Sequence, residues 1–293
     1  YSEVADQLDY NRAKVVIVVP KGFASNLSHG RADIQVIVDG SDSTTASLAI
    51  SYATQIVQAF SRDARVREVA VRGMSAASAP SLDVKTRFWY NPELNSTNFI
   101  VPGLIAIILM LLSSLLTSMT IVRERERGSI EQLVVSPIRS HELMLGKLAP
   151  YVVIAFFDVV VVILAARFIF GVPLVGSVPL LLVTSFLFLI AALGLGLLIS
   201  VISNTQLVAM IIAVVVTMLP TLLLSGFMYP ISTMPPPIRA VTYLLPARYY
   251  LVIVRGVFLK GVGPEVLWPQ AVLLLVAGAI LIALSARKFK KVL

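Results

Sequence analysis

The stretch that decides the fold is residues 99–133, which read FIVPGLIAIILMLLSSLLTSMTIVRERERGSIEQL. More than twenty residues without a charge are followed directly by five consecutive charged residues. A membrane-spanning helix needs about 20 apolar residues, because the hydrocarbon core of a bilayer is about 30 Å thick. The stretch therefore predicts a transmembrane helix that leaves the membrane at a charged segment.

The composition of the whole chain also indicates a membrane protein. Of its 293 residues, 57% are hydrophobic and 14% are charged, whereas soluble domains carry about 25% charged residues. The net charge of +8 arises after Asn98, since ten Lys and Arg balance ten Asp and Glu up to that residue, against fourteen and six beyond it. These cations flank apolar runs, which favours orienting the chain in a membrane over binding nucleic acid.

Five apolar runs are long enough to span a membrane. They are residues 99–122, 146–170, 178–202, 207–229 and 267–286. Cations gather in the segment between the first two runs and in the C-terminal tail, so both should be cytoplasmic. They are Arg123, Arg125, Arg127, Arg139 and Lys147, then Arg287, Lys288, Lys290 and Lys291. Residues 1–98, which precede the first run, are then expected to be extracytoplasmic.

The region 1–98 is expected to be a mixed α/β domain, which makes the fold class a polytopic α-helical membrane protein with an extracytoplasmic domain. Strands are predicted at Val15–Val19, Ile34–Val38, Val66–Val71 and Leu82–Trp89, and a helix at Ser43–Phe60. The cluster 39–43 predicts a turn followed by a helix cap at Asp42 or Ser43. A calcium loop is disfavoured, because no acid follows at the twelfth position.

Residues 230–265 differ from an ordinary span. Pro235–Pro237 interrupt them, as do four cations. A helix beginning at Pro246 would carry Arg248 and Arg255 on one face, with apolar residues between them. This pattern favours an interfacial or re-entrant helix on the outer side, with a partly ordered loop as the alternative.

Two features inside the spans are open to two interpretations each. Asp158 lies eleven residues beyond Lys147, or about 16 Å along a helix, so it is placed near the middle of the membrane. It could belong to a transport pathway or pair with a neighbouring helix. Ala192, Gly196 and Ser200 recur every four residues, which favours close helix packing within one subunit over a dimer contact.

Signatures for nucleotide binding and catalysis are absent from the sequence. It contains no G-x-x-x-x-G-K-[ST], G-x-G-x-x-G, G-x-S-x-G or H-E-x-x-H pattern, no cysteine, and only two separated histidines. No catalytic residue, metal site or cofactor is therefore expected in this chain. If ATP is used, a partner subunit binds it.

The charged stretch from Arg123 to Val135 is predicted to be a helix at the cytoplasmic end of the first run. It could lie on the lipid surface or insert into a groove of another protein. Its mixture of Arg and Glu favours the groove, because a helix on anionic lipid would be rich in Lys and Arg alone. Gly128 suits a bend or a close backbone approach.

Six separated motifs resemble the ABC-2 type transporter permeases, in particular their multidrug-exporter-like branch. They are VDGSDSTTA at Val38–Ala46, WYNPELNSTNFIVPG at Trp89–Gly103, ERERGSIEQLVVSP at Glu124–Pro137, LGKLAPY at Leu145–Tyr151, FGVPLVGS at Phe170–Ser177 and PARYYLVIVRGVFLKG at Pro246–Gly261. The resemblance covers nearly the whole chain.

The resemblance implies a six-helix half-transporter that dimerises and is driven by cytoplasmic ATPase subunits. The ATPase would dock on a coupling segment, here 123–142, with candidate residues Arg123, Glu124, Arg125, Glu126, Arg127, Gly128, Glu131 and Gln132. The outer re-entrant segment would be 230–265, with Pro246, Arg248, Arg255 and Gly261. The family has a first span before the outer domain, so a first transmembrane helix is expected to be missing from this chain.

The sequence thus predicts the permease subunit of an ABC exporter in the cytoplasmic (inner) membrane. It would move a hydrophobic or amphiphilic compound outward, with a partner ATPase, a second permease copy or paralogue, a periplasmic adaptor and membrane lipid as partners. One alternative is a mechanotransmitting membrane protein that acts through its outer domain. The other is an ion-coupled secondary transporter that uses Asp158, although the sequence shows no inverted repeat.

Overall fold

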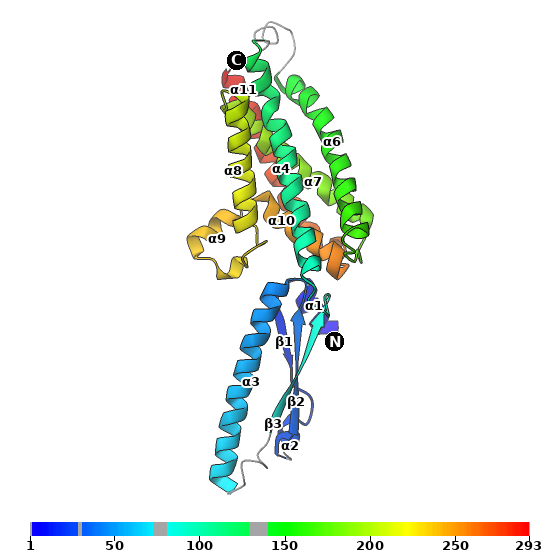
Figure 1. Cartoon of the computed structure of the whole chain (residues 1–293), viewed down its shortest axis with the longest axis vertical. Coiled ribbons are helices and arrows are strands. Elements are labelled where there is room, and N and C mark those ends of the chain that lie inside the picture. The colour runs from blue at the N-terminus through cyan, green and yellow to red at the C-terminus, as the bar shows by residue number, and fades with distance from the viewer. Residues whose placement is uncertain (1, 29–30, 73–80, 129–139, 293) are drawn as a thin grey trace. The chain divides into compact units, whose positions relative to one another are not determined.

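The computed structural model describes residues 2–28, 31–72, 81–128 and 140–292. The chain separates into two compact units, Tyr1–Phe99 and Ile100–Leu293. Their helices and strands are labelled in Figure 1. Each unit has a hydrophobic core of its own.

The first unit contains a three-stranded sheet. Strand β1 (Val15–Val18) pairs antiparallel with β2 (Arg31–Asp39), which pairs in parallel with β3 (Ser81–Trp89). A parallel pair needs a long crossover connection, which is helix α3 (Ser43–Arg72). Two short helices are α1 (Ser2–Asp9) and α2 (Phe23–Ser28). The core joins the sheet to α3 through Ile34, Val36, Val38, Ala46 and Ala53.

The turn and helix cap predicted between β2 and α3 are confirmed. Asp42 Oδ1 accepts a hydrogen bond from the backbone N–H of Thr45 at 3.0 Å, in the first turn of α3. The buried Asp39 carboxylate accepts from Lys14 Nζ at 3.1 Å and from the backbone N–H of Ser41 at 3.0 Å. These bonds fix the point at which the strand ends and the helix begins.

The strand predicted at Val66–Val71 is wrong, because α3 continues through it to Arg72. Its β-branched residues disfavour a helix by less than about 0.7 kcal/mol each relative to Ala. No Gly or Pro lies between Phe60 and Arg72 to end the helix. The helix predicted at Ser43–Phe60 is therefore longer by twelve residues, and the sheet has three strands rather than four.

The second unit is helical, and five of its helices are long and apolar enough to cross a membrane among the residues that the structure describes. They are α4 (Ser96–Glu126), α6 (Ser140–Phe168), α7 (Val178–Ile202), α8 (Gln206–Leu224) and α11 (Pro264–Val292). A bent pair of shorter helices would make a sixth crossing if it were counted as one span.

Two helices end earlier than the hydropathy pattern predicts. Helix α8 ends at Leu224, five residues before the predicted limit, because Gly226 has a φ of 87° that a helix does not accept. Helix α6 ends at Phe168, and Gly171 follows with a φ of 66°. Apolar side chains continue past both ends, so hydropathy alone overestimates the helix length.

Helix α7 is packed closely on two sides through glycine. A Cβ on Gly196 would lie 2.5 Å from the backbone oxygen of Ser114 in α4. A Cβ on Gly194 would lie 3.2 Å from the Leu281 side chain in α11, and Ser285 Oγ donates to the Gly194 carbonyl at 3.2 Å. The prediction that the stripe of Ala192, Gly196 and Ser200 packs within one subunit is confirmed, because this stripe contacts α4 of the same chain.

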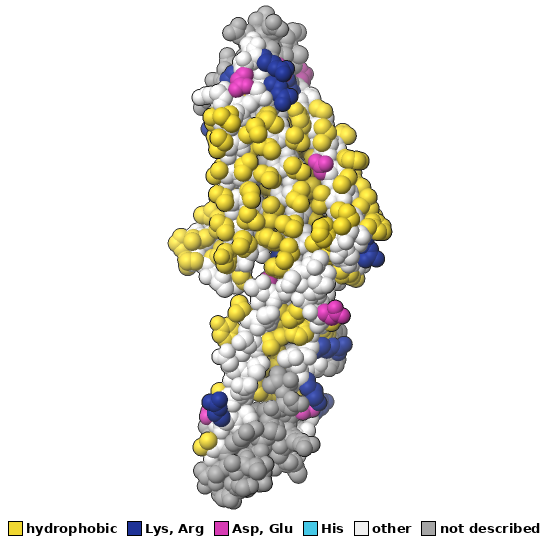
Figure 2. Space-filling model, viewed as in Figure 1, with side chains coloured by type: hydrophobic (Ala, Val, Ile, Leu, Met, Phe, Trp, Pro, Cys, Tyr) yellow, Lys and Arg dark blue, Asp and Glu magenta, His cyan; other side chains and the backbone are white. Residues whose placement is uncertain are grey.

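The exposed surface around the long helices of the second unit is mostly apolar. In the most apolar 18-residue stretch of each long helix, 61% of the residues are buried in α4 and 67% in α7. The corresponding share is only 17% to 22% in α6, α8 and α11. Figure 2 shows a belt of apolar side chains over this unit, with several Lys and Arg side chains beyond it at the upper end. Such a belt is what the hydrocarbon core of a bilayer requires.

Candidate functional site

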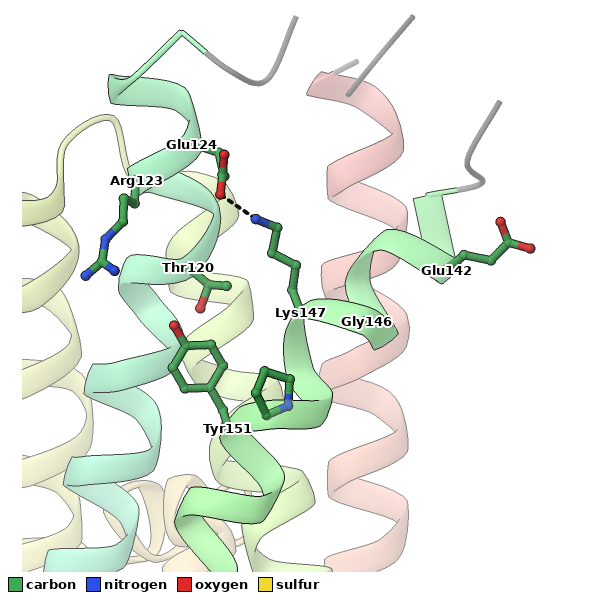
Figure 3. A pocket seen from close by; sticks show the side chains of 8 residues that line it. Thr120, Arg123, Glu124, Glu142, Gly146, Lys147 and Tyr151 are labelled. Atoms are coloured by element: carbon green, nitrogen blue, oxygen red, sulfur yellow. Dashed lines mark hydrogen bonds and ion pairs between the residues drawn. The ribbon is translucent and has the colours of Figure 1, made fainter. Parts of the chain in front are cut away.

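The predicted coupling segment begins as the last turn of α4, and it lies beside the start of α6. Glu124 Oε1 and Lys147 Nζ are 2.5 Å apart, and each side chain is about a quarter exposed. Figure 3 shows this pair at the rim of a cavity of about 530 Å³. The cavity is lined by Thr120, Arg123, Glu124, Glu142, Gly146, Lys147, Pro150 and Tyr151. The ion pair therefore links two helices that are joined in sequence only through residues 127–139.

The same turn of α4 is bound to the short link between α7 and α8. Glu126 accepts a hydrogen bond from the backbone N–H of Gln206 at 2.8 Å and another from its side-chain amide. Arg125 donates to the carbonyl of Ser203 at 2.9 Å, and Arg123 Nε donates to Gln206 Oε1 at 3.3 Å. The charged residues thus make contacts on two sides of α4. Glu124 pairs with α6, whereas Arg123, Arg125 and Glu126 bind the α7–α8 link.

Two buried hydrogen bonds attach α4 to α7 in the apolar turn just before the charged residues. Ser200 Oγ accepts from the backbone N–H groups of Ile121 and Val122, at 3.0 and 3.2 Å. The end of α4 is therefore attached directly to α7. Sequence reasoning missed Ser203 and Gln206, because about 80 residues separate them from Arg125 and Glu126.

The helix predicted from Arg123 to Val135 is not continuous. Helix α4 ends at Glu126, and Gly128 adopts a φ of 72°, which lies outside the helical region. The bend predicted at Gly128 is confirmed. The remaining predicted coupling residues, Glu131 and Gln132, lie outside the described residues. Arg127 is exposed at the start of the bend.

Asp158 lies in the middle of α6, among side chains that face outward. It is half-buried, and its neighbours Ile154 and Phe157 are 46% and 66% exposed. Among the described residues, no hydrogen bond or ion pair to its carboxylate is found. Arg167 is exposed near the far end of the same helix, about 13 Å further along by helix rise. The structure therefore places an acid in the apolar belt without a partner from the described part of this chain.

The predicted outer segment is a bent pair of helices. Helix α9 (Pro236–Thr242) and helix α10 (Pro246–Arg255) meet at 78°, and a π-helical segment, Gly256–Lys260, extends α10. Pro246 is the first residue of α10, as predicted. Gly261 ends the π-helical segment with a φ of 69°. A short 3₁₀ turn, Ile231–Thr233, precedes the pair.

Arginine side chains anchor both parts of this outer segment. The Arg248 guanidinium lies 3.9 Å from the centre of the Tyr243 ring and donates to Thr242 Oγ1. Arg255 donates to the carbonyl of Gly226 at 3.3 Å. Stacking on an aromatic ring and bonding to a carbonyl each satisfy part of a guanidinium group that leaves bulk water.

Helix α10 is fixed against the core of the bundle. Tyr250 is fully buried, and its ring stacks on that of Phe188 in α7 with the ring centres 4.1 Å apart. The Tyr250 hydroxyl lies 2.7 Å from Ser185 Oγ. The link between α6 and α7 joins the same segment, because Gly176 N–H donates to the Val257 carbonyl at 2.9 Å. Sequence reasoning singled out both motifs but not their contact, since more than 80 residues separate them.

Comparisons with known proteins agree with this arrangement. The family model described as ABC-2 family transporter protein matches residues 1–287. The chain is 36% identical over 99% of its length to a probable multidrug ABC transporter permease, YbhS, of Escherichia coli, and the match covers 76% of that protein. It is 31% identical over 98% of its length to the probable multidrug ABC transporter permease YbhR, with 77% of that protein covered.

A more distant relative comes from a eukaryote. ABC transporter G family member 20 of Dictyostelium discoideum is 27% identical over 63% of this chain, which covers 25% of that protein. The family match extends over both units, and it includes the charged end, the bent pair and all of the described helices except the last five residues of α11. The chain therefore belongs to the ABC-2 family of transporter proteins.

Proposed function

We propose that the chain is the permease subunit of an ATP-driven exporter that moves a hydrophobic or amphiphilic compound out across the cytoplasmic membrane. The observation that carries the proposal is the charged end, where one turn of α4 binds both α6 and the α7–α8 link. The names of YbhS and YbhR support a drug-like substrate. The apolar belt and five long helices support a multi-pass membrane location.

In this proposal the coupling segment 123–142 receives a cytoplasmic ATPase, which binds the ATP. Force applied there reaches α6 through Glu124 and Lys147, and it reaches α7 through the hydrogen bonds of Glu126 and Ser200. The exposed Arg127 and the mixed charges around it suit a protein partner, because complementary charges fix the register of docking. The catalytic groups for ATP hydrolysis belong to that ATPase in this proposal, and the described residues of the chain include no group of three or more His, Asp or Glu side chains that could hold a metal ion.

The assembly follows from membership of the family. A family of ABC permeases implies a partner ATPase and a dimeric arrangement, formed with a second copy or a paralogue. The unit 1–98 would lie outside the cytoplasm, where a periplasmic adaptor could reach it, and lipid would cover the apolar belt. Neither alternative function gains support from the comparisons. ATPase coupling without transport would favour mechanotransmission, and dependence on a proton or sodium gradient would favour secondary transport.

The test of coupling uses two exposed arginines at opposite ends of the bundle. Arg127→Glu reverses a charge beside the bend in the coupling segment, whereas Arg167→Glu makes the same change near the far end of α6. We expect Arg127→Glu to weaken co-purification of the ATPase about tenfold, or ~1.4 kcal/mol. The control variant, Arg167→Glu, should co-purify with the ATPase as well as the original chain does. Equal retention by both variants, with transport intact, would show that the charged stretch serves only to orient the chain.

A further inference from the structure

Helix α3 has a second apolar side that the first unit does not cover. Ala46 and Ala53 pack in the core with the sheet, and Val57 is also buried. Four large side chains, one on each successive turn, are between 50% and 65% exposed on another side of the helix. These form the α3 stripe: Leu48, Tyr52, Ile56 and Phe60. Figure 1 shows α3 as the long helix of this unit.

The stripe lies in a stretch without charge. Ser43–Ser61 contains no Asp, Glu, Lys or Arg, and Ser, Thr and Gln occupy its polar side. Single exposed apolar residues are ordinary, but a contiguous row on four turns marks an interaction surface. A helix that binds a lipid surface carries Lys or Arg on its polar face, and the stretch Ser43–Ser61 carries none. A charged partner protein would also find no charged side chain in this stretch to pair with.

We infer that the α3 stripe packs against the same stripe of a second copy of this chain. A two-fold contact uses one surface twice, so it must complement itself, and an uncharged surface brings no like charges together. The four residues follow an i, i+4 ridge, about 6 Å apart along the axis. Packing of such ridges on both helices is the commonest class of helix contact, at a crossing angle of about −50°.

The inference rests on the dimeric arrangement of the proposed function. Two copies joined through their membrane units hold their first units at an effective concentration in the millimolar range, so a modest apolar contact is enough to pair them. The contact would leave Gln58 on the opposite side of α3, because two residues correspond to 200° of helix rotation from Ile56.

The experiment uses the natural absence of cysteine from the chain. Two differently tagged copies are co-expressed in membranes, each with Tyr52→Cys, Ile56→Cys or the control Gln58→Cys, and treated with a short bis-maleimide. All three positions are exposed. We expect about tenfold more cross-linked dimer carrying both tags for Tyr52→Cys and Ile56→Cys than for Gln58→Cys, because a helix about 10 Å wide separates its two sides.

Several outcomes distinguish this inference from the proposed function. Labelling by a monofunctional maleimide shows that each cysteine is accessible, and elution of each purified variant as a single species in detergent shows that it is folded. If the two tags co-purify but Tyr52→Cys and Ile56→Cys yield no more dimer than Gln58→Cys, the stripe contact is wrong while the dimer stands. Cross-linking to a different protein would assign the stripe to a partner and overturn the inference. If the tags do not co-purify, the chain does not pair with a second copy of itself, which overturns the inference and leaves a dimer with a paralogue as the arrangement in the proposed function.

Discussion

Glu124 and Lys147, which are 23 residues apart in sequence, form an ion pair between α4 and α6. Because both side chains are partly exposed, the pair stabilises the fold by only about 1 kcal/mol or less. In the coupling that we propose, the pair serves to position the helices, since it holds the end of α4 against the start of α6. Mutation of this pair is therefore expected to affect coupling more than it affects the stability of the fold.

A charge swap tests this role. Glu124→Lys and Lys147→Glu each place like charges side by side, so we expect transport-linked ATP hydrolysis to fall several-fold while folded yield changes little. The double variant restores opposite charges and should recover most of the activity. The measurement is hydrolysis by the purified complex with and without transport substrate. A double variant as defective as the single ones would mean that each residue acts alone.

At the scale of elements, the contact between α4 and α7 depends on glycine. Gly196→Ala would place a methyl group 2.5 Å from the backbone oxygen of Ser114, so the helices must separate. We expect a loss of about 1–3 kcal/mol in unfolding free energy and a lower midpoint of thermal unfolding in detergent.

Gly146→Ala in α6 is the matched control, because no atom of the residues that the structure describes lies within 4 Å of its Cβ position. Alanine favours a helix over glycine by about 1 kcal/mol, so this variant should be at least as stable as the original chain. A Gly196→Ala variant with unchanged stability would contradict the close packing of α4 on α7.

The elements differ in how far the sequence predicts them. The helix cap at Asp42 and the start of α10 at Pro246 depend on local chemistry, and both were predicted correctly. The last twelve residues of α3 were not predicted as helix. Their β-branched residues favour a strand only weakly, so tertiary packing decides which structure forms. The bonds of Glu126 to Gln206 join residues 80 positions apart, and no local pattern predicts such a pairing. At the site, sequence thus identified the charged residues but not their partners.

At the scale of the whole molecule, the helices divide into buried and peripheral ones. Helices α4 and α7 form the interior of the second unit, whereas α6, α8 and α11 expose most of their apolar surface. Lipid satisfies apolar side chains but not a carboxylate. Asp158 is the only acidic residue between Glu142 and Glu265, and it lies on one of these peripheral helices. What covers α6 in the assembled transporter therefore decides the role of this acid.

We predict that Asp158→Asn lowers transport about tenfold, or ~1.4 kcal/mol in the activation free energy, while folded yield stays the same or rises. A carboxylate at that depth is costly unless it is used or paired, and Asn keeps its shape without the charge. The measurement is efflux from membrane vesicles, normalised to the amount of purified protein. Asp158→Glu, which keeps the charge, is the control and should retain more transport than Asp158→Asn. If Asp158→Asn instead reduces yield and leaves the normalised efflux unchanged, the carboxylate pairs with a neighbouring helix and has no part in the pathway.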